Sequence, residues 1–267
     1  LDNGENSHTE YSDILYDLLN PLIPVLPFYG LHYSLQQTSS GCAYPDLTRD
    51  LIQTINNGAA LINYIGHGSP TTWSGEKLID KARDLSLIHP NENRLAIWVA
   101  GTCSFGNYYG ENSFMEELLL REKGAIAVLA STDLIGYDDN WHYIKSLFGY
   151  DNDQGIEDYI NNGEDIRLGE LAWRAKNLNE DYKFHTFGDP ALPLPFPKKT
   201  TENLVIDPPD TIHLVQEEFI VFNNIFSYSS ILIRENEKKY LFDYGTDSLT
   251  YTVPGATYVQ MDISGNS

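Results

Sequence analysis

The chain has 267 residues, 42% of them hydrophobic, with 38 acidic and 17 basic residues and a formal net charge of −21. Its length and apolar content suffice for one large domain and a smaller second one. The negative charge argues against nucleic acid and anionic membrane surfaces as partners, and no apolar run is long enough to span a bilayer.

Helical and strand patterns alternate from the start of the chain. Apolar residues recur at helical spacing in 7–22. They do so again in 46–58, where Asp46 is the expected N-cap and Gly58 lies just past the end. The apolar run 59–65 then predicts a short strand that is buried on both faces.

The alternation continues beyond this strand. It predicts a second buried strand at 95–100, a helix at 112–124 capped by Asn112 or Ser113, a third buried strand at 125–131 and an amphipathic helix at 167–178. Strands that alternate with helices indicate a parallel α/β sheet. Functional sites in such sheets form at the carboxyl ends of the strands.

The sequence changes character after the proline-rich segment 187–199. From about residue 203 onward, five short runs read as strands separated by turns, which is typical of a small all-β sandwich. We therefore predict two domains, an α/β domain over 1–197 and a β-sandwich over 198–267.

Two polar residues directly follow predicted strands. His67 lies between two glycines after the first strand, and Cys103 follows the second. A cysteine becomes a strong nucleophile as a thiolate, which a histidine on a neighbouring strand end can generate. The amides of Gly68 and Cys103 are candidates to stabilise the oxyanion that forms during peptide cleavage.

Each feature also has a simpler explanation. His67 alone is explained by a turn in which it caps a strand end, and Cys103 alone by a small hydrophobic core residue. Two cysteines, Cys42 and Cys103, exclude a disulfide framework but leave one bridge between them open. The six histidines other than His67 show no spacing typical of metal ligands.

No signal peptide is visible, and the chain begins without an initiator methionine, so we expect a piece of a longer or processed protein. High acidity with many tyrosines and asparagines suits a secreted or surface protein and favours Ca²⁺. The segment DNDQG offers Asp151 and Asp153 as Ca²⁺ ligands, but it lacks the glutamate of an EF-hand, and a solvated acidic turn is the favoured explanation. We expect no catalytic cofactor or metal.

Four blocks of sequence resemble the gingipain-type cysteine peptidases. They are GAALINYIGHGSPTTW, VAGTCSFGN, GAIAVLASTDLIGY and FGDPALPL, in the order and approximate spacing of that family. The resemblance covers residues 1–197 and implies a caspase-like catalytic domain, followed by an immunoglobulin-like domain. The family includes secreted gingipains and the signal peptidase (sortase) of the type IX secretion system, towards which CSFGNYYGENSFMEELL leans.

The resemblance also implies roles for individual residues. It makes His67 the general base and proton donor and Cys103 the nucleophile, with Gly68 and Cys103 supplying the oxyanion-binding amides. The backbone of Ile65 and Gly66 would line the primary specificity pocket. Two aromatic residues join this set: Tyr137 as a lid over that pocket or as ordinary packing, and Trp73 as a substrate contact or a support of the loop.

The chain departs from the family in two places. The acid that orients the histidine lies upstream of residue 1 in the family, and Asp2, Glu5 and Glu10 are the substitutes available here. Arginine-specific members carry a pocket acid where this chain has Ser7 and His8. Arginine selectivity would then need another acid, such as Asp138 or Asp139.

These features together predict a thiol protease, a hydrolase that attacks protein or peptide substrates through a Cys/His dyad. We expect it at the cell surface of a bacterium, associated with the outer membrane, or secreted, with a secretion-system or surface partner. The alternative is a catalytically inactive peptidase-like domain that binds a partner protein.

Overall fold

The computed structural model describes residues 7–38, 41–90, 94–110, 113–151, 154–162 and 165–196, together with the backbone of five later strands. The chain divides into two compact units, Leu1–Phe196 and Pro197–Ser267. Within the described residues, no helix combines the length and apolar character needed to cross a membrane.

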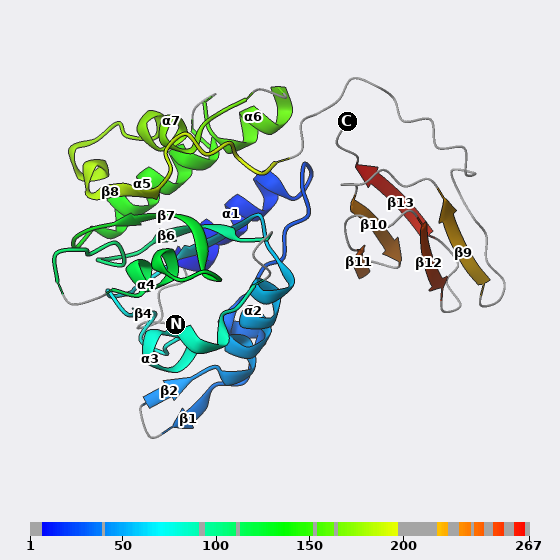
Figure 1. Cartoon of the computed structure of the whole chain (residues 1–267), viewed down its shortest axis with the longest axis horizontal. Coiled ribbons are helices and arrows are strands. Elements are labelled where there is room, and N and C mark those ends of the chain that lie inside the picture. Colours follow the sequence, from blue (N-terminus) through cyan, green and yellow to red (C-terminus); the bar gives the residue numbers. More distant parts are fainter. Residues whose placement is uncertain are drawn as a thin grey trace. The chain divides into compact units, whose positions relative to one another are not determined.

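A four-stranded sheet forms the centre of the first unit (Figure 1). Its strands lie in the order β3 (Leu61–Ile65), β6 (Ala96–Gly101), β7 (Ala125–Ser131) and β8 (Phe184–Gly188). The first three are parallel, and β8 runs antiparallel to β7. The three predicted parallel strands and the α/β class are confirmed, whereas the antiparallel edge strand β8 was not predicted.

The apolar strand residues alternate between two hydrophobic cores, one on each face of the sheet. Ile97 and Val99 of β6 belong to one core, and Trp98 and Ala100 belong to the other. All six residues of β6 are buried, which explains its unbroken apolar sequence. In contrast, β3 is buried at only two of its five residues, because it lies at the edge of the sheet.

Helices cover both faces (Figure 1). The first core contains residues of α1 (Ser7–Leu19), α5 (Tyr137–Phe148), α6 (Ile156–Asn162) and α7 (Leu168–Arg174). The second core contains residues of α2 (Pro45–Asn57) and α4 (Phe114–Leu120). The sheet is therefore the middle layer of three.

The helix ends differ in places from those that were predicted. The expectation that Asp46 caps α2 is wrong, because Tyr44 holds the N-cap position and Pro45 occupies the first turn, where its missing N–H costs nothing. Ser113 does cap α4 and forms a capping box with Glu116. That helix ends at Leu120, short of the predicted end at residue 124.

Shorter elements complete the first unit. They are the hairpin of β1 (Gln36–Thr38) and β2 (Gly41–Ala43), the pair β4 (Thr72–Trp73) and β5 (Ile79–Asp80), the short helix α3 (Lys81–Asp84) and the 3₁₀ turns Gly30–His32, Leu85–Leu87 and Asn179–Lys183. The β4–β5 pair and α3 follow His67 in the chain, so they belong to the loop region of the candidate site.

The described strands of the second unit are all antiparallel. One pair joins β9 (Glu218–Asn223) to β12 (Ser248–Val253). A second sheet places β10 (Ser230–Glu235) between β11 (Lys238–Phe242) and β13 (Val259–Ser264). The immunoglobulin-like sandwich stays a prediction.

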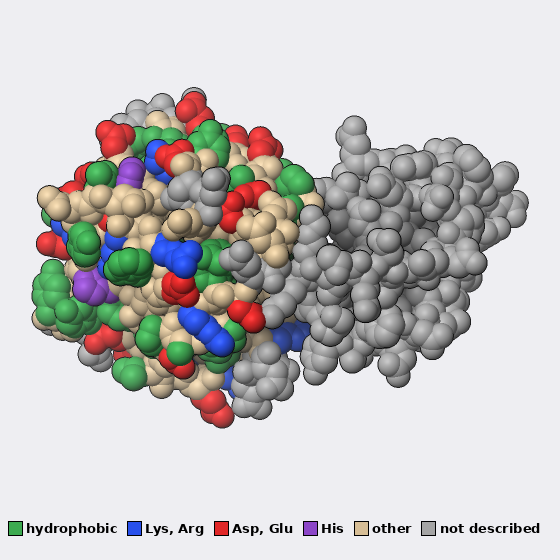
Figure 2. All heavy atoms as spheres, turned by 90° about the horizontal axis from the view of Figure 1, so that it is seen from above, with side chains coloured by type: hydrophobic (Ala, Val, Ile, Leu, Met, Phe, Trp, Pro, Cys, Tyr) green, Lys and Arg blue, Asp and Glu red, His purple; other side chains and the backbone are tan. Residues whose placement is uncertain are grey.

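Figure 2 shows one face of the first unit with its side chains coloured by type. Acidic side chains are spread around this face among hydrophobic and polar ones, and lysine and arginine gather only in small groups. Among the side chains visible there, no continuous basic surface of the kind that binds nucleic acid is present.

Candidate active site

The register of β3 and β6 brings His67 and Cys103 to one edge of the sheet. Ile65 pairs with Gly101 at the end of the two parallel strands, and the amide of Gly66 donates to the carbonyl of Gly101 at 3.1 Å. His67 and Cys103 each follow that pair by two residues. Because neighbouring strands lie about 4.8 Å apart, the strand ends that precede these two residues are adjacent.

The two loops that carry these residues are in contact. A Cβ atom placed on Gly68 would lie 2.4 Å from Oγ1 of Thr102, the residue that precedes Cys103, and 2.9 Å from the carbonyl oxygen of Thr72. Thr102 is buried, with 1% of its surface exposed. Glycine is thus required next to His67 because the neighbouring loop occupies the space of a side chain.

The backbone of His67 is held from two sides, while its side chain is exposed. Its carbonyl accepts a hydrogen bond from the Tyr64 hydroxyl at 2.8 Å and another from the amide of Ser74 at 2.7 Å. The Tyr64 ring stacks on Trp73, with 4.6 Å between ring centroids and 6° between planes. Trp73 is 2% exposed, so its side chain supports the loop from within the core.

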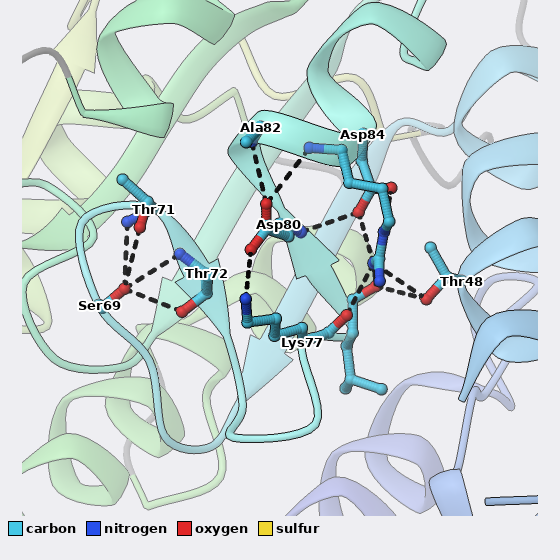
Figure 3. Close-up of polar contacts among 10 residues, drawn as sticks. Thr48, Ser69, Thr71, Thr72, Lys77, Asp80, Ala82 and Asp84 are labelled. Atoms are coloured by element: carbon cyan, nitrogen blue, oxygen red, sulfur yellow. Dashed lines mark hydrogen bonds and ion pairs between the residues drawn. The ribbon is translucent and has the colours of Figure 1, made fainter. Parts of the chain in front are cut away.

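A polar network fixes the segment after His67 (Figure 3). Ser69 Oγ accepts the amides of Thr71 and Thr72 and lies 2.9 Å from Oγ1 of Thr72. Further along, the Asp80 side chain accepts the amide of Ala82 and caps α3. These bonds turn the chain back on itself directly beside the candidate histidine.

Asp84 anchors the far end of this segment. Its carboxylate is buried, accepts the amide of Asp80 at 2.8 Å and pairs with Nε of Arg83 at 2.6 Å. The Asp84 carboxylate raises the pKa of the Arg83 guanidinium. Arg83 also donates to the carbonyl of Lys77 at 2.7 Å, and Thr48 of α2 donates to Leu78, so the loop is tied to a rigid helix (Figure 3).

Cys103 is a free, half-buried thiol. Its Sγ lies 3.5 Å from the carbonyl oxygen of Ile135, and its side chain packs against the first core. The next residue, Ser104, donates its amide to Asp133 at 3.0 Å, and Gly106 donates to Ser131 at 2.9 Å. The cysteine loop is therefore fastened to the end of β7.

Three described residues other than glycine have positive φ angles. Ser74 has φ 61°, Lys77 has φ 52° and Ser104 has φ 56°. All three lie in the loops that follow His67 and Cys103. Backbone strain of this kind persists only where the surrounding structure holds it, and it concentrates at functional sites.

The amide of Gly68 takes no part in the backbone pairing of its loop. Gly68 and Trp73 form an isolated antiparallel bridge whose hydrogen bonds run from Ser74 to His67 and from Ser69 to Thr72. Gly68 occupies the position in this bridge that makes no backbone hydrogen bond to its partner. Its N–H therefore points away from Trp73.

Sequence reasoning missed Asn140 of α5. This side chain is 4% exposed and donates through Nδ2 to the carbonyl of Gly101 at 2.8 Å. The same carbonyl accepts the amide of Gly66, so one oxygen links both strand ends to the helix. The sequence feature that could have identified Asn140 is a polar residue within the apolar face of a helix, but that helix was not predicted.

His8 lies next to His67, and Tyr137 lies on the other side of His8. The His8 ring is 5.3 Å from that of His67, and the Tyr137 ring is 5.1 Å from that of His8. Tyr137 also stacks on Tyr11 at 5.2 Å. Tyr137 is thus half-buried in aromatic packing beside the site, and its role as a lid over a specificity pocket stays a prediction.

Other predicted residues lie elsewhere. Glu10 is exposed on α1, Asp138 and Asp139 are in the first turn of α5, and Asp151 pairs with Lys145. Asp2, Glu5 and Asp153 lie outside the described residues. Among the residues that are described, no group of three or more His, Cys, Asp or Glu side chains is arranged to hold a metal ion.

Comparison with known proteins identifies the family. The model of peptidase family C25 matches residues 2–195, a range that contains His67, Cys103 and both loops. The chain belongs to peptidase family C25. This confirms the resemblance to gingipain-type peptidases that the four sequence blocks indicated.

Two relatives of this C25 chain come from Porphyromonas gingivalis. Gingipain R2 and gingipain R1 are each 30% identical to it over 138 residues, or 49% of this chain. The match covers 17% of gingipain R2 and 12% of gingipain R1. The C25 chain therefore spans less than a fifth of the length of these relatives.

Two solved structures are also similar to the C25 chain. One, described as a structure of a protease, has a TM-score of 0.45 at 17% sequence identity. The match covers 78% of this chain and 49% of the chain in that structure. The other is the complex of the pro- and mature domains of Porphyromonas gingivalis RgpB, with a TM-score of 0.47 at 16% identity. This second match covers all of this chain and 62% of the chain in that structure.

Proposed function

We propose that the first unit is a cysteine endopeptidase in which Cys103 is the nucleophile and His67 the general base. The observation that carries this proposal is the register of β3 and β6, which ends both strands at the pair Ile65 and Gly101. Membership of a peptidase family and contact between the two loops support it.

The proposed reaction proceeds through a thioester. His67 takes the proton from Sγ of Cys103, and the thiolate attacks the carbonyl carbon of the scissile peptide bond. The amides of Gly68 and Cys103 stabilise the resulting oxyanion. His67 then gives its proton to the leaving amine as the C–N bond breaks, and a water molecule activated by His67 hydrolyses the thioester to regenerate the thiol.

Protein or peptide substrates follow from this chemistry. We propose that the backbone of Ile65 and Gly66 and the ring of Tyr137 line the site for the residue before the cleaved bond. The support is the position of Ile65 and Gly66 at the end of β3 and the contact of Tyr137 with His8, whose ring in turn contacts His67. Trp73 is assigned to the support of the loop because its side chain is buried.

The acceptor of the acyl group distinguishes two forms of this function. With water as acceptor the protein is a protease, and with an amine of a surface glycolipid it is a sortase-like transpeptidase of type IX secretion. We propose a bacterial protein that is secreted or associated with the outer membrane, as its relatives come from a bacterium. The chemistry of a thiol and an imidazole requires no metal or other cofactor.

One observation favours the alternative of an inactive binding module. Sγ of Cys103 packs towards the core and lies 3.5 Å from the carbonyl of Ile135, which suits a small core residue as well as a nucleophile. In that case partner binding would survive the substitution Cys103→Ala unchanged.

Labelling of the thiol decides between the two. A peptidyl chloromethyl ketone should modify Cys103 of the full chain, and His67→Ala should slow this labelling strongly because only the thiolate reacts fast. The matched control is His89→Ala, which removes another exposed histidine. Absence of labelling in folded wild-type protein would refute the peptidase. If labelling occurs, a library of peptides that differ in the residue before the cleaved bond defines the substrate preference.

A further inference from the structure

A row of aromatic rings runs from the candidate base into the packing of two helices. His8 lies edge-on to His67, with 5.3 Å between ring centroids and 86° between ring planes. On its other side His8 contacts Tyr137 at 5.1 Å and 61°. Tyr11 stacks on Tyr137 at 5.2 Å and on Trp141 at 4.1 Å, where the planes differ by 4°.

The helices hold this row in place. His8 and Tyr11 are three residues apart on α1, and Tyr137 and Trp141 are four apart on α5, so each pair shares one helix face. Leu15 of α1 is buried in the first core. His8 therefore sits on a helix that is packed firmly against the sheet and α5.

We propose that His8 is a positioning residue that fixes the plane of the His67 imidazole. This inference rests on the proposed function of His67 as general base. The His67 side chain is exposed, and its ring lies edge-on to that of His8. An edge-to-face contact is a favoured geometry of aromatic rings. Such a contact favours one plane of the His67 ring over others.

The proposed role depends on the flat ring of His8 and not on its nitrogen atoms. A phenylalanine at this position keeps a flat ring of similar size and therefore keeps the edge-to-face contact. An alanine removes it. The pair His8→Ala and His8→Phe thus separates loss of the ring from loss of its nitrogen atoms.

Steady-state kinetics on peptide substrates provide the first test. We expect His8→Ala to lower kcat about tenfold with KM little changed, as the rotational restraint on the base is lost. We expect His8→Phe to recover kcat to within about threefold of wild type. The control substitutions His89→Ala and His89→Phe should leave both constants unchanged.

The variant Tyr11→Ala distinguishes a positioning role of His8 from a general destabilisation of the helix packing. This change loosens α1 against α5 without touching His67, and melting curves show whether it destabilises the protein as much as His8→Ala. If Tyr11→Ala lowers kcat equally at equal stability, or if His8→Phe is as slow as His8→Ala, the positioning role is refuted. An unchanged kcat in His8→Ala refutes it as well.

A second measurement does not depend on activity. In full-length Cys103→Ala protein with ¹³C-labelled histidine, NMR should show the His67 ring signals shifting and losing order in His8→Ala but not in His89→Ala. If chloromethyl ketone labelling fails but the His67 signals respond to His8→Ala, the peptidase function is refuted and the ring contact is confirmed. If the enzyme is active but the His67 signals do not respond to His8→Ala, only the positioning role of His8 is refuted.

Discussion

Gly68 packs against Thr102 so closely that the loop of the candidate base and the loop of the candidate nucleophile touch. The contact joins two segments that lie 34 positions apart in the sequence, from the ends of neighbouring parallel strands. Because Thr102 is itself buried, neither side can move away to admit a larger residue.

The substitution Gly68→Ala should therefore damage the site. The new methyl group would lie 2.4 Å from Oγ1 of Thr102 and 2.9 Å from a backbone oxygen of Thr72, so the His67 loop must shift. We expect kcat/KM to fall about tenfold to a hundredfold.

The matched control for this change is Gly30→Ala, where the nearest atom to a new methyl group is 3.4 Å away. That variant should retain wild-type kinetics and stability. A Gly68→Ala protein with full activity would show that the two loops separate easily in solution.

The hydrogen bond from Tyr64 to the carbonyl of His67 predicts a second effect. Tyr64→Phe keeps the ring stacked on Trp73 but removes the 2.8 Å bond. We expect the free energy of unfolding to fall by about 1 kcal/mol and kcat to fall severalfold, as measured by urea titration and peptide hydrolysis.

Tyr29→Phe serves as its control, because it removes a hydroxyl bonded to Asp13 at 2.7 Å in another part of the unit. It should leave kcat unchanged. Equal kinetic effects in the two variants would contradict a local role for Tyr64.

The buried carboxylate of Asp84 predicts a loss of stability. In Asp84→Ala, the Arg83 guanidinium and the amide of Asp80 lose their acceptor. The Arg83 side chain is 40% exposed and can turn to solvent, so we expect a cost of about 2 kcal/mol, below that of breaking a fully buried pair. Urea unfolding measures it.

Glu170→Ala is the comparison for Asp84→Ala, since it breaks an exposed pair with Arg174 within α7. Its cost should not exceed about 0.5 kcal/mol. The kinetics add a second criterion, because only Asp84→Ala loosens the segment that follows His67 and should lower kcat/KM.

His185 predicts a dependence of stability on pH. His185 is exposed but partly desolvated by its neighbours. This desolvation, followed by the charge of the nearby Lys176, lowers the pKa of His185 below its ordinary value, and a backbone hydrogen bond with Tyr182 opposes this only in part. The unfolded chain therefore binds a proton at higher pH than the folded protein. The stability contributed by this group is present above about pH 6.5 and is lost as the pH falls.

His185→Gln should accordingly reduce the loss of unfolding free energy between about pH 7.5 and about pH 5.5, on either side of the ordinary histidine pKa. Urea titrations at both values measure the difference. A steeper loss in His185→Gln than in wild type would reverse the assigned sign.

Much of the sheet could be predicted because burial on both faces leaves a clear trace in the sequence. The strand Ala125–Ser131 has the bounds expected from its apolar run. His67 and Cys103 could be paired from sequence because parallel strands in succession end at one edge. Their register, and hence the shared end at Ile65 and Gly101, required the structure.

The helix Tyr137–Phe148 was missed although it has recognisable ends. Asp138 and Asp139 lie in its first turn, Gly149 follows its last residue, and Ile144 and Leu147 are buried. Tyr137 was considered only as an isolated aromatic residue near the site. The contacts of Asn140 with Gly101 and of His8 with His67 depend on how α1 and α5 pack, which no local pattern encodes.

The left-handed backbone at Ser74, Lys77 and Ser104 limits how the region around the site can be diversified. Residues branched at Cβ are strongly disfavoured in this conformation, whereas glycine and asparagine adopt it readily. In a saturation library selected for cleavage of new peptides, valine and isoleucine should vanish from these three positions. Designers who wish to alter selectivity would therefore keep these three turns constant and vary the residues between them.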